Sequence, residues 1–205
     1  MSRQAQTAKS QKTSFSIDPR YIGRLVGTLT GICLVVALLL GIVNYVTKPL
    51  IDASQKAKQD AAMAQVLAAD SYEKLEFTTA NVTALYKAVA GGAQIGWVAE
   101  TSTSGSQGAI QMMVGVDIDS RVTGVSIVKH SETPNIGTKV VGDQSVLDRF
   151  IGMSHADGGE ITVNTGTNRF DGVTGATYSS KGAAAGVNAA LTAVSEYLAQ
   201  GGQTQ

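Results

Sequence analysis

A run of 22 residues without a charged side chain, Leu25–Val46, constrains this chain more than any other feature. As a helix the run would extend about 33 Å, which is enough to cross the hydrocarbon core of a bilayer once. A cleaved signal peptide has an apolar region of about 7 to 15 residues followed by a small-residue cleavage site, and the run has neither property. We therefore expect an uncleaved transmembrane anchor over residues 21–47.

The charges around the anchor predict its orientation. Before it stand one acid, Asp18, and several basic residues, which are Arg3, Lys9, Lys12, Arg20 and Arg24. Short basic flanks normally remain in the cytoplasm. We expect a cytoplasmic polar tail over residues 1–20, a single pass through a bacterial inner membrane, and an extracytoplasmic chain from Lys48 onwards.

Composition excludes several kinds of site from the part of the chain after the anchor. Residues 48–205 contain 11 Lys and Arg against 15 Asp and Glu, so no basic surface for nucleic acid is expected. The only cysteine, Cys33, lies in the anchor, which leaves the outer part without a disulfide or a cysteine-ligated iron–sulfur cluster. His130 and His155 are too far apart for metal-ligand spacing, and no metal site is predicted.

Hydrophobic periodicity predicts an α+β domain beyond the anchor. Near-helical spacing of alanine and leucine indicates a stalk helix over residues 48–70. Alternating apolar residues separated by turn signals indicate strands in the region that follows. The expected strands span residues 83–89, 93–100, 109–118, 121–129 and 160–166. Asp119 and Ser120 form a tight turn, so the third and fourth strands should make a hairpin.

A C-terminal helix closes the predicted domain. Its apolar stripe recurs at helical spacing and consists of Val187, Leu191, Val194 and Leu198. A short helix over residues 144–152 and a loop over residues 152–159 come before it. The expected fold is a single N-terminal transmembrane helix followed, over residues 71–205, by an antiparallel sheet with flanking helices.

The stretch DGVTGATYSS, residues 171–180, opens the C-terminal helix with four Ser and Thr side chains and two glycines. A helix N-terminus favours an anion, and the backbone N–H groups near Gly175 to Ser179 would suit a phosphate. The next charge along the chain is instead Lys181, a cation that opposes the helix dipole by about 0.3 to 1 kcal/mol. A phosphate flanked by Lys181 would resolve this conflict. The alternative is an ordinary helix start capped by a hydroxyl.

The same stretch resembles the flavinylation motif of the FMN-binding domain family, which reads acidic residue, two positions, Ser or Thr, then Gly-Ala-Thr. The matching residues are Asp171, Thr174, Gly175, Ala176 and Thr177. In that family the last threonine carries FMN through a phosphoester bond, so the resemblance implies Thr177 as the attachment site. Tyr178, Ser179 and Lys181 complete the implied surroundings of the phosphate. Asp171 is expected to orient the turn or to help present it to the metal of a transferase, and the alternative is an Asx cap.

A second segment, residues 112–137, resembles the sheet and loop of the G subunits of Rnf complexes. The residues that match the loop are His130, Glu132, Thr133, Pro134 and Gly137. Asn135 stands where glycine is common, and Asn tolerates a positive φ. The resemblance makes Glu132 and Thr133 candidates for contact with the flavin ring. Further flavin contacts, or core residues as the alternative, are Trp97, Met112 and Met113.

Together these resemblances imply a membrane-anchored electron carrier with covalent FMN. Rnf complexes join membrane and peripheral subunits to couple ferredoxin oxidation by NAD⁺ to Na⁺ or H⁺ movement, and this chain would not be a catalyst alone. The sequence near Thr177 offers no base, so a separate flavin transferase that uses FAD and Mg²⁺ is implied. One alternative is the covalent-flavin subunit of the Na⁺-translocating NADH:quinone reductase or of another respiratory or extracellular chain. The other is an anchored scaffold domain that is never flavinylated.

Overall fold

The computed structural model describes residues 19–202 of the 205-residue chain. They fall into two compact units, one ending at Asp52 and the other beginning at Ala53, and helix α1 (Pro19–Val66) contributes to both. The expected cytoplasmic tail, residues 1–20, lies almost entirely outside the described residues. That expectation therefore stays a prediction.

The first unit consists of the apolar part of α1. Leu29, Leu34 and Leu40 are between 61% and 66% exposed, and their large apolar neighbours in α1 are exposed as well. The Thr28 hydroxyl donates a hydrogen bond to the carbonyl oxygen of Arg24 at 3.1 Å, so its polarity is satisfied within the helix. Within residues 19–202, α1 is the one helix long and apolar enough to cross a membrane. These features agree with the predicted single pass.

The predicted stalk helix ends earlier than expected. We expected it over residues 48–70, but α1 ends at Val66. After the helix, the N–H of Asp70 donates a hydrogen bond to the carbonyl oxygen of Val89 at 2.9 Å, so residues 67–70 are no longer helical and the chain pairs with the sheet from Asp70 onwards. Strand β1 (Ser71–Leu75), which was not predicted from the sequence, follows directly.

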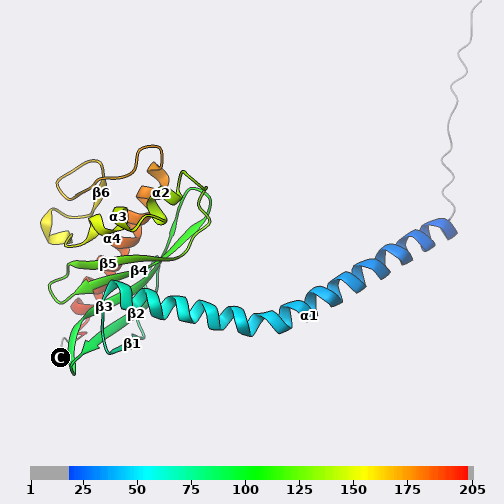
Figure 1. Cartoon of the computed structure of the whole chain (residues 1–205), viewed down its shortest axis with the longest axis horizontal. Coiled ribbons are helices and arrows are strands. Elements are labelled where there is room, and N and C mark those ends of the chain that lie inside the picture. The colour runs from blue at the N-terminus through cyan, green and yellow to red at the C-terminus, as the bar shows by residue number, and fades with distance from the viewer. Residues whose placement is uncertain (1–18, 203–205) are drawn as a thin grey trace, which may run out of the picture. The chain divides into compact units, whose positions relative to one another are not determined.

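Five strands of the second unit form one antiparallel sheet in the order β1-β2-β3-β4-β5. After β1 they are β2 (Val82–Ala90), β3 (Ala93–Ser104), β4 (Ala109–Asp117) and β5 (Val122–Lys129). Gly91 and Gly92, at φ of +60° and +79°, join β2 to β3, and Ser120, at +59°, lies in the turn from β4 to β5. The four strands predicted before residue 130 and the hairpin are confirmed (Figure 1).

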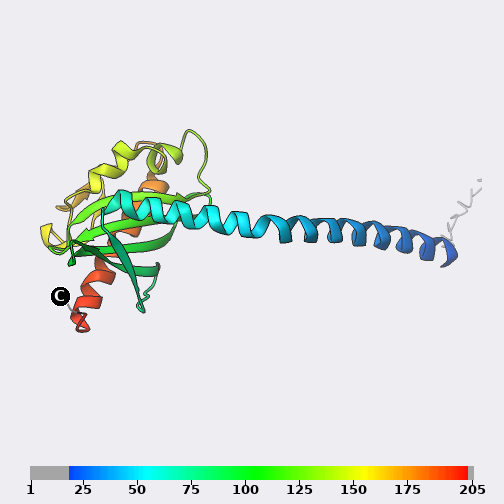
Figure 2. The ribbon, with the colours of Figure 1, turned by 60° about the horizontal axis from the view of Figure 1, so that its bottom comes forward.

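A helix covers each face of the sheet. On one face α4 (Thr177–Ala199) packs against β3 and β4, with Val187 and Trp97 in the same apolar cluster. On the other face, Met63 at the end of α1 belongs to a second apolar cluster with Met113. Figure 2 shows α4 and the end of α1 on opposite sides of the strands. The predicted α+β fold with flanking helices is confirmed. The side chains weighed as flavin contacts are fully buried and belong to the core; they are Trp97, Met112 and Met113.

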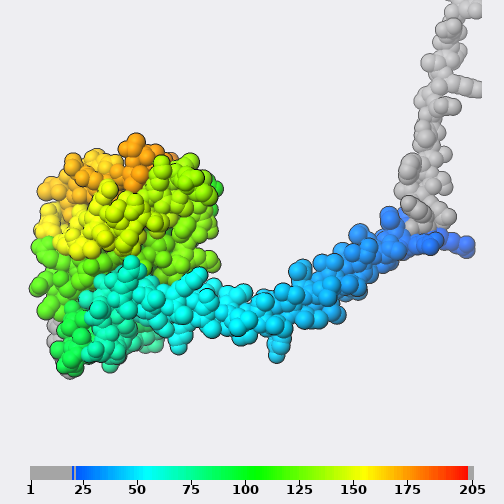
Figure 3. Space-filling model, in the orientation of Figure 1, coloured from blue at the N-terminus to red at the C-terminus, as the bar shows by residue number. Residues whose placement is uncertain are grey.

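The segment between β5 and α4 carries only short elements, and Figure 3 shows its surface in yellow and orange. They are α2 (Thr138–Val141), α3 (Gln144–Leu147), η1 (Asp148–Phe150), η2 (His155–Asp157), β6 (Thr162–Val163) and β7 (Arg169–Phe170). The rings of Phe150 and Phe170 stack with centroids 4.0 Å apart and anchor the segment to the core. The strand predicted over residues 160–166 shrinks to β6, because Asn164 and Gly166 take φ of +59° and +79°, outside the extended region.

Candidate functional site

The motif DGVTGATYSS places Thr177 at the first residue of α4. Gly175 makes the preceding turn at φ +82°, a conformation that favours glycine. Ala176 is the N-cap residue, and no side-chain hydrogen bond from the described residues caps the helix. The Ser180 hydroxyl instead accepts a hydrogen bond from the N–H of Val173 at 3.2 Å and ties the turn to the helix. The alternative of a hydroxyl-capped helix start is therefore wrong.

Two glycines let the first half of α4 lie directly on the sheet. A Cβ at Gly182 would be 2.7 Å from the carbonyl oxygen of Ser104, and one at Gly186 would be 2.6 Å from the Sδ of Met112. The hydroxyl of Thr103 donates to the carbonyl oxygen of Gly182 at 2.8 Å. The beginning of α4 is therefore held against β3 and β4.

The side chains around this helix start divide into an exposed and a buried group. Thr174, Thr177, Tyr178 and Lys181 are exposed, whereas Ala176 and Ser179 are buried. Within residues 19–202 nothing accepts or donates a hydrogen bond to the Thr177 hydroxyl, and the N–H groups of Thr177, Tyr178 and Ser179 have no acceptor. Apart from Gly175 and its two neighbours in the chain, no heavy atom lies within 4 Å of the position that a Cβ would take at Gly175. The site therefore offers a free hydroxyl, free amide donors and open space.

Lys181 lies on the same side of α4 as Thr177, because residues four apart in a helix are neighbours. No carboxylate in the described part of the chain pairs with its ammonium group, since the salt bridges found there belong to Arg121 and Arg169. An unpaired cation beside free N–H groups at a helix N-terminus is an environment that suits a phosphate.

The first turn of α4 contains no acidic residue, but the carboxylate of Glu132, from another part of the chain, contacts it. Glu132 is only 6% exposed, and its Oε2 accepts hydrogen bonds from the hydroxyls of Ser179 at 2.7 Å and Ser106 at 2.5 Å. Its Oε1 accepts from the N–H of Ser106 at 2.7 Å. Burial acts to raise the pKa of Glu132, but the hydrogen bonds from Ser106, Ser179 and the backbone outweigh it and hold the pKa below its usual value. Glu132 is therefore a buried, ionised group that contacts the motif through Ser179 on the inner side of α4.

The backbone of the loop that carries Glu132 depends on Asn135 and Gly137. Asn135 takes a φ of +62°, as its replacement of glycine led us to expect, and its N–H donates to the Thr138 hydroxyl at 2.9 Å. A Cβ at Gly137 would collide with the Glu132 carboxylate. Thr133 is half-buried beside it. That Glu132 and Thr133 contact a flavin ring stays a prediction, and here the carboxylate of Glu132 is turned inward.

Asp171 is fixed by two arginines that were not expected from the sequence. Its carboxylate pairs with the Nε of Arg169 at 2.9 Å, and its carbonyl oxygen accepts a hydrogen bond from Arg149 at 2.8 Å. These contacts orient the turn in place of an Asx cap. The carboxylate remains more than half exposed, and its role toward a transferase metal stays a prediction.

Sequence reasoning also missed Ser106, which lies in a polar loop whose spacing gives no sign of its contact with Glu132, 26 residues away. Each of the two histidines has a hydrogen-bond partner within the domain. Nδ1 of His130 accepts a hydrogen bond from the N–H of Glu132 at 3.3 Å, and Nε2 of His155 lies 3.1 Å from Oδ1 of Asn188. Residues 19–202 contain no cluster of three metal-ligating side chains.

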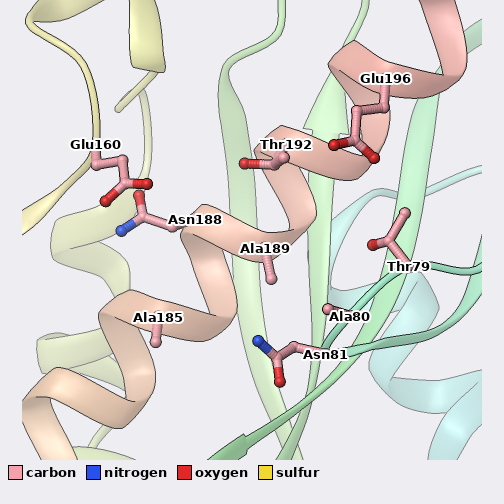
Figure 4. A pocket seen from close by; sticks show the side chains of 9 residues that line it. All are labelled: Thr79, Ala80, Asn81, Glu160, Ala185, Asn188, Ala189, Thr192 and Glu196. Carbon is pink, nitrogen blue, oxygen red and sulfur yellow. The ribbon is translucent and has the colours of Figure 1, made fainter.

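A cleft of about 480 Å³ lies along the later turns of α4 (Figure 4). Glu160 and Asn188 face each other across part of it, and Glu196 lines it further along the helix. The Asn188 amide is already used by the backbone of Ile161, to which it donates and from which it accepts at 2.9 Å. No residue of 171–180 lines this cleft, so it is separate from the motif.

Comparison with known proteins first identifies the class of domain to which the second unit is similar. Residues 105–192, from the end of β3 into α4, match the model of the FMN-binding domain. The second unit therefore contains an FMN-binding domain, and the chain also has an apolar N-terminal helix. Among solved structures, the crystal structure of NqrC from Shewanella oneidensis aligns with 60% of the chain and 64% of its own, at 19% identity and a TM-score of 0.44.

Relatives of full length define the family. The G subunit of the Na⁺-translocating ferredoxin:NAD⁺ oxidoreductase complex of Acetobacterium woodii is 29% identical over 198 residues, covering 88% of this chain and 95% of its own. The G subunit of the ion-translocating oxidoreductase complex of Methanosarcina acetivorans is 31% identical over 187 residues, covering 87% and 97%. The chain belongs to the family of G subunits of ion-translocating oxidoreductase complexes, as its two motifs led us to expect.

Proposed function

We propose that this chain is an electron-carrying subunit of an Rnf-type ion-translocating oxidoreductase complex, with FMN joined to Thr177 by a phosphoester bond. The observation that carries the proposal is the unpartnered, exposed hydroxyl of Thr177 at the first residue of α4. Membership of the G-subunit family and the match to the FMN-binding domain support it.

The residues around Thr177 fit a phosphate. The N–H groups of Tyr178 and Ser179 are free to donate, and Lys181 lies one turn further along the same side of α4. Anions at a helix N-terminus gain about 0.3 to 1 kcal/mol from the helix dipole. Gly175 leaves the space beside the threonine open, which gives access to a phosphate and to the enzyme that delivers it. Exposed Thr174 borders the same turn.

Attachment requires a second protein. The Thr177 oxygen would form a bond to the phosphorus of the FMN half of FAD, the bond from that phosphorus to the AMP oxygen would break, and AMP would leave. The hydroxyl proton needs an acceptor, and no base within residues 19–202 contacts Thr177. We therefore assign the base and the Mg²⁺ to a flavin transferase, and the exposed Asp171 carboxylate is our candidate for contact with that enzyme.

Bound FMN would supply the redox chemistry that amino-acid side chains lack. This chain's residues would hold the phosphate at the start of α4, and the covalent bond would keep the cofactor from being lost. We place the second unit on the extracytoplasmic side because of the basic residues that precede the anchor. The other subunits of the complex would provide the electron donor, the electron acceptor and the ion path.

The test is to produce the full-length chain together with an active flavin transferase. Flavin fluorescence that survives a denaturing gel, with an intact mass raised by one attached FMN, is the expected result. Thr177→Ala should abolish both signals, while Thr167→Ala, which removes an exposed hydroxyl outside the motif, should retain them. An unmodified wild-type chain would overturn the proposal and favour an anchored scaffold that carries no flavin.

A further inference from the structure

The start of α4 lacks an anchor of its own. Its N-cap, Ala176, offers no side-chain acceptor, and Lys181 places a cation near the positive end of the helix. The hydrogen bond that fixes the first turn from outside joins the hydroxyl of Ser179 to Oε2 of Glu132, which lies 47 residues earlier in the sequence. A distant carboxylate thus holds the first turn of this helix through a side chain and leaves the backbone N–H groups of the turn free.

Glu132 itself is held in one place from several sides. The Ser106 hydroxyl and N–H donate to its two oxygens, and glycines at positions 105 and 137 leave the space that the carboxylate fills, since a Cβ at either would collide with it. No cation within residues 19–202 forms a salt bridge with it. Because no cation balances its charge, the position of the carboxylate depends on these neutral donors together.

Helix geometry connects this contact to the attachment site. Successive residues of an α-helix are about 100° apart, so Ser179 and Thr177 point in directions about 200° apart, while Lys181 lies only about 40° from Thr177. When Ser179 is held inward by Glu132, Thr177 and Lys181 must face outward together. Their burial agrees with this, since Ser179 is 1% exposed and the other two are exposed.

We propose that Glu132 is a positioning residue for flavin attachment: through Ser179 it fixes the rotation of the first turn of α4 and so presents the Thr177 hydroxyl to the transferase. The inference rests on the proposed function, and it assigns to Glu132 a task other than contact with the flavin ring. It requires that loss of the Ser179 hydroxyl slow the modification even though Thr177, Lys181 and the backbone N–H groups of the first turn are all retained.

The test compares two matched substitutions in the full-length chain, Ser179→Ala and Ser106→Ala. Each removes one hydroxyl that donates to the same Oε2 atom, but only Ser179 belongs to α4. With purified transferase, FAD and Mg²⁺, we expect kcat/KM for flavin attachment to fall about tenfold in Ser179→Ala, the effect of losing a hydrogen bond to a charged group. Ser106→Ala keeps its backbone bond to Oε1 and should change kcat/KM by less than about twofold.

Amide hydrogen exchange separates positioning from general loss of stability. Ser179→Ala should speed exchange at Ser180, whose N–H makes the first bond of α4 to the carbonyl oxygen of Ala176 at 2.9 Å, without speeding exchange in β3 or β4. Wild-type attachment rates in Ser179→Ala, or equal losses in both variants, would overturn the positioning role while leaving Thr177 as the attachment site. A wild-type chain that accepts no flavin would overturn both proposals.

Discussion

The two motifs that carry the family resemblance are built in opposite ways. The motif at the start of α4 turns Thr177 outward, beside Lys181, and leaves both without partners. The loop of residues 130–137 turns the Glu132 carboxylate inward, where Ser106 and Ser179 satisfy it with hydrogen bonds. A substitution at an exposed residue of the first motif should therefore change chemistry and spare the fold. A substitution at the buried carboxylate should disturb the fold first, and chemistry only through it.

The largest expected effect separates these two behaviours. Thr177→Ala should remove covalent flavin completely and yet change the free energy of unfolding by less than about 0.5 kcal/mol, because the side chain is exposed and unbonded. Unfolding of the full-length protein in micelles can be followed in urea by the fluorescence of Trp97, the single tryptophan, which is fully buried. A clear loss of stability in this variant would mean that the hydroxyl has a structural role.

Glu132→Ala should show the opposite pattern. It leaves the buried donors of Ser106 and Ser179 without their acceptor, and we expect the free energy of unfolding to fall by about 2 to 4 kcal/mol. Glu132→Gln keeps the volume and one oxygen acceptor, so its loss should be smaller. Urea unfolding followed by Trp97 fluorescence measures both, and a change below about 0.5 kcal/mol for Glu132→Ala would show that the buried carboxylate does not stabilise the unit.

Acid titration tests the same carboxylate through its charge. The folded-state pKa of Glu132 lies below its ordinary value of 4.5, so its contribution to stability is present above that value and is lost as the pH falls through the folded pKa. The wild-type chain should therefore lose stability more steeply below about pH 4.5 than Glu132→Gln, which has no charge to lose. Parallel curves of urea midpoint against pH would contradict this expectation.

The same contrast explains how far the sequence could lead. Periodicity of two and of 3.6 residues is local, so the anchor, the strands from residue 83 to 129 and helix α4 were predictable from it. β1 was missed because the short, polar SYEKL lacks a clear period and is a strand only through its pairing with β2. The contact of Glu132 with Ser106 and Ser179 joins three distant segments, and no spacing rule encodes such a contact.

The helix start is a place where local reasoning goes wrong. From the sequence, a cation and no carboxylate near residue 177 indicated that an external phosphate would balance the helix dipole. In the fold Glu132 supplies a carboxylate from behind the first turn. The free N–H groups of Tyr178 and Ser179, rather than a missing charge, are therefore what supports phosphate binding.

The smallest expected effect concerns Lys181 and should depend on whether the flavin is attached. In the unmodified chain Lys181 opposes the dipole of α4, so Lys181→Ala should raise the free energy of unfolding by about 0.3 to 1 kcal/mol. Once a phosphoester occupies Thr177, the lysine gains an anionic neighbour one turn away, a pair worth about 0.2 to 0.5 kcal/mol on a helix surface. The gain from the substitution should therefore shrink or reverse in the flavinylated chain.

Urea unfolding of Lys181→Ala with and without covalent flavin measures this difference, and Lys139→Ala provides the control. Lys139 is another lysine without a salt bridge in the described structure, but it lies in α2 rather than on the outward side of α4. Its removal should have the same effect in both forms. If Lys181→Ala, like the control, changed the free energy of unfolding equally in both forms, the lysine would not be a neighbour of the phosphate. The free backbone N–H groups at the start of α4 would then be the principal ligands of the phosphate.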